Sequence, residues 1–95
     1  MSKGQKKYRK KYKFHLYVTG ASMNSLSAIA NIKRLCEEKF SQNYQLEIID
    51  VYQQPEVAKS ENIVALPLFI KKFPLPEKRF IGTMSDTEKL VSGIG

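Results

Sequence analysis

The hydrophobic pattern changes its period twice within the first 51 residues, and this change constrains the fold more than any other feature of the sequence. Residues 14–19 alternate in character and are rich in aromatic and β-branched side chains, which is typical of a strand. Apolar residues then recur every three or four positions as far as residue 40, which predicts a helix of about 16 residues. Residues 44–51 alternate again. Strand, helix and strand in this order predict a right-handed β–α–β unit.

The predicted helix has a start signal and an inward stripe. Asn24 or Ser25 can serve as the N-cap, because either side chain accepts a hydrogen bond from a free backbone N–H group of the first turn. The stripe expected to face the core is Leu26, Ile29, Ile32, Cys36 and Phe40. In the second strand Ile48 and Ile49 are both apolar and point to opposite faces. We therefore expect that strand to be buried on both sides, as a central or parallel strand is.

The second half of the chain continues as a short helix, two strands and a last helix. Pro55 suits the first position of a helix over residues 56–62, and residues 63–70 are strand-like although Pro67 lacks an N–H donor. Residues 78–82 form a short strand, and Ser85 with Glu88 fits a capping box ahead of a helix that the later glycines weaken. This is the α/β element order of a thioredoxin-like domain, in which a proline placed like Pro67 is often cis.

The chemistry-bearing residues argue against an enzyme. Thioredoxin chemistry needs two cysteines at the N-terminus of the first helix, where the sequence has residues 21–25 without a thiol. Cys36 falls about three turns later and is expected to be a buried apolar residue. His15 has no nucleophile at triad spacing, and Asp50 has no partner carboxylate. One Cys and one His leave no metal cluster, and no glycine-rich phosphate loop is present. We expect no catalytic, metal or cofactor site, and a binding module instead.

The net charge of +7 belongs to the start of the chain. Seven of the 16 Lys and Arg residues lie in residues 1–13, which contain no acidic residue. The remaining residues, 14–95, contain nine basic and nine acidic residues and are therefore neutral. We expect residues 1–13 to be a disordered basic tail and residues 14–95 to be a single domain. The tail is either a solubilising arm or an arm that contacts phosphate or an acidic partner. No apolar run approaches the ~20 residues of a membrane span.

Several short motifs, in order and spacing, resemble the KaiB family of circadian clock proteins from about Tyr12 to Gly95. They are Leu16-Tyr17-Val18-Thr19-Gly20, Asn24-Ser25, Ile49-Asp50-Val51, Pro55, Ala65-Leu66-Pro67, Pro74-Leu75-Pro76, Ile81-Gly82 and Ser85-Asp86. The resemblance implies a cytoplasmic, non-enzymatic regulator that binds the ATPase ring of KaiC without a cofactor. It also implies a metamorphic second half, with a resting form that is commonly a tetramer, or else a dimer, and a thioredoxin-like form that binds KaiC.

The resemblance extends to single positions. Family residues linked to fold choice and oligomer packing are matched by Tyr12, Pro67, Lys71 and Gly93. The surface expected to contact the KaiC-like partner comprises Asp50, Gln53, Gln54, Glu56, Lys59 and Asn62. The chain departs from the family at two contact positions, where Ser27 replaces an arginine and Asn62 replaces a lysine.

Two further departures lie near the C-terminal end. A family aspartate falls at Gly95, and the usual Gly-Asp-Leu-Ser reads Gly82-Thr83-Met84-Ser85. Together the departures speak against KaiA capture. The alternative function is a thioredoxin-like adaptor for another partner, or a nucleic-acid-associated protein that acts through its basic arm, although nucleic acid is the less expected partner.

Overall fold

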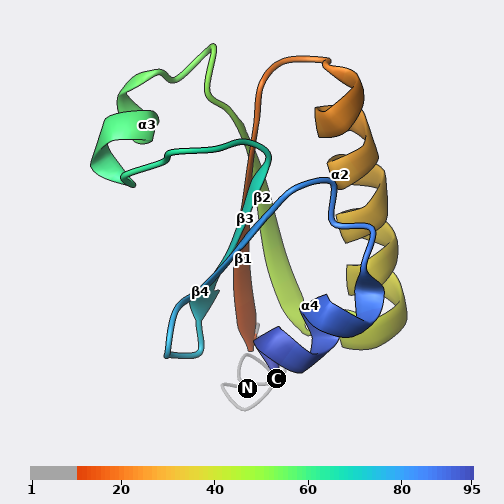
Figure 1. Cartoon of the computed structure of the whole chain (residues 1–95). Coiled ribbons are helices and arrows are strands. Elements are labelled where there is room, and N and C mark those ends of the chain that lie inside the picture. Colours follow the sequence, from red (N-terminus) through yellow and green to blue (C-terminus); the bar gives the residue numbers. More distant parts are fainter. Residues whose placement is uncertain (1–10) are drawn as a thin grey trace, which may run out of the picture.

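The computed structural model describes residues 11–95. Most of the expected basic tail, residues 1–10, therefore lies outside the described part of the chain. The elements follow the predicted order of β–α–β, short helix, two strands and last helix (Figure 1). They are β1 (Tyr12–Val18), α2 (Met23–Leu35) with a π-helical continuation (Cys36–Phe40), β2 (Tyr44–Asp50), α3 (Glu56–Ser60), β3 (Leu68–Phe73), β4 (Lys78–Ile81) and α4 (Thr87–Ile94).

The four strands form one mixed sheet in the order β2-β1-β3-β4. Strands β1 and β2 are parallel, with Leu16 opposite Ile48, as the β–α–β pattern predicts. Strand β3 runs antiparallel to β1, and β4 runs antiparallel to β3. Helices α2 and α4 cover one face of the sheet, and α3 lies over one end of the other face (Figure 1).

The two faces of the sheet carry two separate cores, because successive side chains of a strand point to opposite sides. Between the sheet and helices α2 and α4 lies the larger core, which includes Phe14, Leu16, Ile32, Phe69 and Leu90. Under α3 lies a smaller core, which includes Tyr17, Ile49, Val51, Leu68 and Ile70. No helix within residues 11–95 is long and apolar enough to cross a membrane.

Strand β1 begins at Tyr12, two residues before the expected start of the domain. The Tyr12 ring packs against Phe40 with ring centroids 4.6 Å apart, and its backbone N–H donates to the carbonyl of Asn43. Aromatic packing and a backbone hydrogen bond therefore draw part of the charged segment into the sheet.

The start of α2 and one residue of its expected inward stripe differ from the prediction, whereas the other four stripe residues are buried or pack against the larger core as expected. The N-cap is Ser22, whose hydroxyl accepts from the backbone N–H of Ser25, and neither Asn24 nor Ser25 has that role. Ser25 is fully buried, and Leu26, which was expected to face the core, is 49% exposed. Ser25 can be buried because its hydroxyl accepts from the backbone N–H of Thr19.

Strand β2 is an edge strand, so the expectation of burial on both faces is wrong. Ile49 is buried under α3, but Ile48 on the other face is 38% exposed. Tyr44 and Leu46, which point to the same face as Ile48, are only half-buried against the larger core.

Two boundaries in the second half also differ. Strand β3 begins at Leu68, directly after a cis Leu66–Pro67 bond, so residues 63–66 are not part of it. The N-cap of α4 is Asp86, whose carboxylate accepts from the backbone N–H of Lys89, and the predicted capping box of Ser85 does not form.

Helix α4 runs through Gly93 to Ile94, further than predicted. A Cβ atom on Gly93 would lie 2.6 Å from the Phe80 ring. The glycine that was expected to weaken the helix thus allows its close approach to β4.

Candidate functional site

The N-terminus of α2 carries hydroxyl groups at the place where a thioredoxin-type enzyme has thiols. The hydroxyls of Thr19, Ser22 and Ser25 lie within 2.9–3.4 Å of one another. Within residues 11–95, no imidazole or carboxylate is hydrogen-bonded to any of the three. A serine hydroxyl without a base is a poor nucleophile, so this cluster organises the turn between β1 and α2.

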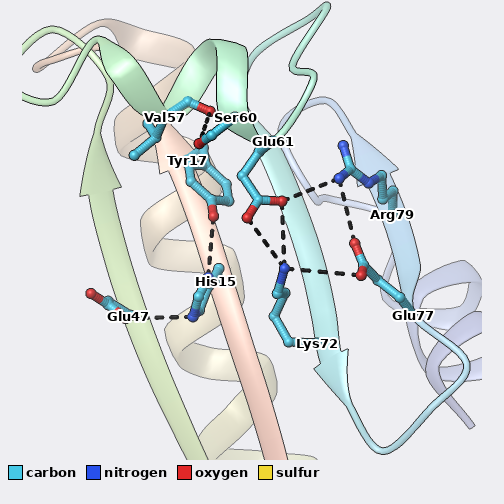
Figure 2. A network of polar contacts seen from close by, with 9 residues as sticks. All are labelled: His15, Tyr17, Glu47, Val57, Ser60, Glu61, Lys72, Glu77 and Arg79. Carbon is cyan, nitrogen blue, oxygen red and sulfur yellow. Dashed lines mark hydrogen bonds and ion pairs between the residues drawn. The ribbon is translucent and has the colours of Figure 1, made fainter.

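The single cysteine and the single histidine are structural. Burial, together with the charge of Glu37, raises the pKa of the Cys36 thiol to about 12. His15 lies on the α3 face, where its Nδ1 is 3.2 Å from the Tyr17 hydroxyl and its Nε2 is 3.4 Å from the Glu47 carboxylate (Figure 2). Burial, together with the charge of Glu61, raises the pKa of Tyr17 to about 12. The Tyr17 phenol thus stays protonated as a partner for His15.

The described residues include no cluster of three or more His, Cys, Asp and Glu side chains that could hold a metal ion.

Asp50 fixes the loop between β2 and α3. Its Oδ1 accepts from the backbone N–H of Gly20 at 3.0 Å and of Tyr52 at 2.9 Å. Its carbonyl accepts from the backbone N–H groups of Gln53 and Gln54. Because these bonds engage one carboxylate oxygen and the carbonyl, Asp50 positions the neighbouring surface residues.

The other five predicted partner-contact residues all lie on the surface of this loop and α3. They are Gln53, Gln54, Glu56, Lys59 and Asn62, and all are exposed. Asn62 has a φ of 57°, a left-handed conformation that asparagine adopts more readily than lysine. The local backbone thus gives a physical reason for asparagine at this position.

An apolar part of the same surface was not predicted. Val64 is 87% exposed and, with Asn62, Leu68 and Ile81, lines a pocket of about 460 Å³. Pro67 could have indicated this surface, because proline lacks the N–H donor of a strand and so favours leaving residues 63–66 outside the sheet. The continuous apolar run over residues 63–70 instead suggested a single strand. We use the name α3 surface for the five exposed residues above together with Tyr52, Val64 and Ile81.

A network of charges links α3 to the strands beneath it (Figure 2). The Glu61 carboxylate lies 3.3 Å from both the Lys72 ammonium and the Arg79 guanidinium. Glu77 pairs with the same two cations, at 3.9 Å and 3.4 Å respectively. Since Glu61 follows α3 directly, the network holds the short helix against β3 and β4.

Three of the four residues expected to govern fold choice lie together. Tyr12, Lys71 and Gly93 line one pocket of about 420 Å³ beside the C-terminal end of α4. Pro67 is not among its lining residues and lies at the other end of β3, where its carbonyl accepts from the backbone N–H of Gly82.

Comparison with known structures gives the same architecture. The N-terminal domain of Synechococcus elongatus SasA aligns with a TM-score of 0.72 at 19% identity, over 87% of this chain and 78% of that one. Mitochondrial thioredoxin 3 from Saccharomyces cerevisiae aligns with a TM-score of 0.71 at 16% identity, over 92% of this chain and 79% of that one. The predicted thioredoxin-like α/β fold is thereby confirmed for the arrangement described here.

Sequence comparison identifies the family. The KaiB domain model matches residues 15–95. The circadian clock protein KaiB3 of Synechocystis sp. (strain PCC 6803) is 49% identical over 79 residues, which cover 83% of this chain and 78% of the relative. The chain therefore belongs to the KaiB family, whose members are non-enzymatic components of the circadian clock.

Proposed function

We propose that this protein binds a KaiC-type ATPase ring in the cytoplasm and modulates the ATPase and phosphorylation cycle of that ring. The observation that carries the proposal is the α3 surface, in which exposed apolar side chains accompany exposed polar ones: Tyr52 adjoins Gln53 in the loop before α3, and Val64 lines a pocket with Asn62 after it. Membership of the KaiB family supplies the partner. No catalytic group is required, because the protein acts by being bound.

The α3 surface has the anatomy of a protein-binding patch. Val64 and Tyr52 offer exposed apolar area, and the surrounding glutamines and charges form a polar rim. Asp50 and the Glu61 network hold this surface from both ends. A surface that is already ordered loses less conformational entropy on binding, which favours affinity.

KaiA capture is not part of the proposal. Ser27 on α2 and Asn62 after α3 are both exposed and uncharged, where the family often carries a cation. A partner that recognises these cations electrostatically would lose its attraction here.

We further propose that the second half exchanges with a different, resting arrangement that assembles as a tetramer or a dimer. Such an exchange requires two packings that differ by only a few kcal/mol. Tyr12, Lys71 and Gly93 share one pocket between the start of β1 and the end of α4, and Pro67 directly precedes β3. All four would therefore change neighbours if β3 and α4 were rearranged.

The test is complex formation with the cognate KaiC in the presence of ATP, followed by size-exclusion chromatography with light scattering. Replacing Val64→Asp places a charge in the apolar part of the α3 surface, and we expect at least a tenfold loss of affinity. Lys39→Gln, on the π-helical segment, is the matched surface control and is expected to bind normally. If the unaltered chain forms no complex after prolonged incubation, the proposal is wrong.

A further inference from the structure

The pocket beside the end of α4 is lined by three lysines and by no acidic side chain. Lys11 directly precedes β1, Lys71 lies within β3, and Lys78 begins β4. The pocket that they line has a volume of about 420 Å³. We call this volume the lysine pocket.

Lys71 is the most unusual of the three because it is buried. Lys71 is only 3% exposed, and its ammonium group donates a hydrogen bond to the backbone carbonyl of Ile94 at 3.2 Å. Among residues 11–95, no carboxylate lies within 4.0 Å of that ammonium. The partial negative charge at the C-terminus of α4 gives it some compensation. A buried ammonium without a carboxylate is costly, and an anion in the pocket would reduce that cost.

The nearest acidic residue in the sequence is already engaged. Glu77 adjoins Lys78, but its carboxylate pairs with Lys72 and Arg79 on the α3 face of the sheet (Figure 2). The Glu77 carboxylate therefore does not neutralise the lysines of the pocket.

The rim of the pocket is apolar, so a ligand that fits it needs an apolar group as well as negative charge. Pro74, Leu75 and Pro76 form part of the lining, and Leu75 is 74% exposed. An isolated inorganic anion would leave this apolar rim uncovered. We propose that the lysine pocket binds an acidic peptide segment of a partner protein, with carboxylates facing the lysines and an apolar side chain covering Leu75.

Nucleic acid fits the pocket less well, because single-stranded binding relies on aromatic faces for stacking. Tyr12 contributes the one aromatic side chain among the described lining residues. Its ring packs on Phe14 and Phe40, and the Lys11 ammonium lies 5.6 Å from its centroid. No arginine is among the described lining residues.

The proposal does not depend on KaiC binding. The lysine pocket lies at the end of the sheet where the described chain begins and ends, whereas α3 lies at the opposite end (Figure 1). Residues 1–10, which carry five basic residues and no acid, join the chain directly at Lys11. That charge would accelerate the approach of an acidic partner.

The experiment measures fluorescence anisotropy of a labelled peptide with three Glu-Glu-Leu repeats, titrated with the full chain at low and moderate salt. Lys11→Gln and Lys78→Gln each remove one exposed charge from the pocket, and we expect each to weaken binding about threefold and the pair about tenfold. Lys39→Gln removes the same charge from the π-helical segment and should change the affinity less than twofold.

Two further comparisons separate the ligand classes. Leu75→Ser should weaken the Glu-Glu-Leu peptide but leave a peptide of glutamates alone unaffected. A ten-nucleotide oligothymidine is expected to bind more weakly than the acidic peptide. An equal loss with Lys39→Gln, equal or tighter binding of the oligonucleotide, or no measurable binding of the peptide would each overturn the proposal.

Discussion

Asp50 shows how the hydrogen bonds of one side chain can hold a surface loop in place. We expect Asp50→Ala to lower the free energy of unfolding by about 2 kcal/mol, because it leaves the Gly20 and Tyr52 N–H groups without their acceptor. Urea denaturation followed by circular dichroism measures the change. Glu38→Ala, an exposed acidic residue on the π-helical segment, is the control and should change stability little. An Asp50→Ala variant as stable as the control would contradict this role.

Cys36 gives a prediction about reactivity and pH. With a pKa raised to about 12, only about one thiol in 10⁴ is ionised at pH 8, so the folded protein should react very slowly with a disulfide reagent. Unfolding in guanidinium should restore rapid labelling. Rapid labelling of the folded chain at pH 8 would show that Cys36 is accessible.

The raised pKa of Cys36 also predicts how the stability of the protein depends on pH. The ordinary thiol value is 9.0, so above pH 9 the unfolded chain loses this proton before the folded chain does. The contribution of the thiol to stability is therefore complete below pH 9 and is lost as the pH rises toward 12. Cys36→Ala should lack this part of the pH dependence in a series of urea denaturations. Tyrosines also titrate in this range, so the comparison is between the variant and the unaltered chain.

The sequence shows directly which residue types are present, but it does not show which of them come into contact in the folded chain. The absence of thiol chemistry followed from which residues occupy the start of α2, and the KaiB family confirms a non-enzymatic protein. The role of Asp50 did not follow, because Gly20 is 30 residues away in the sequence. Only the parallel pairing of β1 and β2 brings that N–H group to the carboxylate.

At the scale of elements, the two helix caps provide a matched pair of tests. Asp86→Ala should destabilise the protein by about 1 kcal/mol, because the carboxylate of Asp86 accepts from the N–H of Lys89, whereas Ser85→Ala should be nearly neutral. In the same way Ser22→Ala should cost about 1 kcal/mol and Asn24→Ala little. Midpoints of urea denaturation decide both pairs. If Ser85→Ala or Asn24→Ala proved the more harmful of its pair, the cap assignments would be wrong.

The errors at helix starts have a common physical origin. Several residues near each start can accept a hydrogen bond from a free N–H group, so composition identifies the region but not the cap. The choice at α2 is made by tertiary contacts, since Ser25 is drawn inward to accept from Thr19. Leu26, the next residue, is exposed, although the periodicity alone places it in the core. Element existence and order were predictable because they depend on long patterns, whereas faces and ends depend on contacts between elements.

At the scale of the whole molecule, the sheet joins two halves with different kinds of connection. Strands β1 and β2 form a local β–α–β unit with α2, whereas β3 enters the sheet by pairing with β1 from more than 50 positions away in sequence. Pairing with β1 could not be predicted from the pattern, since a period of two shows that a strand exists and not which strand adjoins it. The proposed exchange of the second half would break the β1–β3 pairing and leave the β–α–β unit intact.

Native-state hydrogen exchange tests that exchange directly. If the second half rearranges as a unit, the bonded amides of β3, β4 and α4 should exchange with one common opening free energy, a few kcal/mol below that of β1, β2 and α2. A chain without such an exchange should behave differently. Its central strands β1 and β3 should be protected alike, because both have neighbours on each side, and only the edge strands β2 and β4 should open early. The protection of β3 relative to β1 therefore separates the two cases, and equal protection of these two strands would exclude the proposed rearrangement.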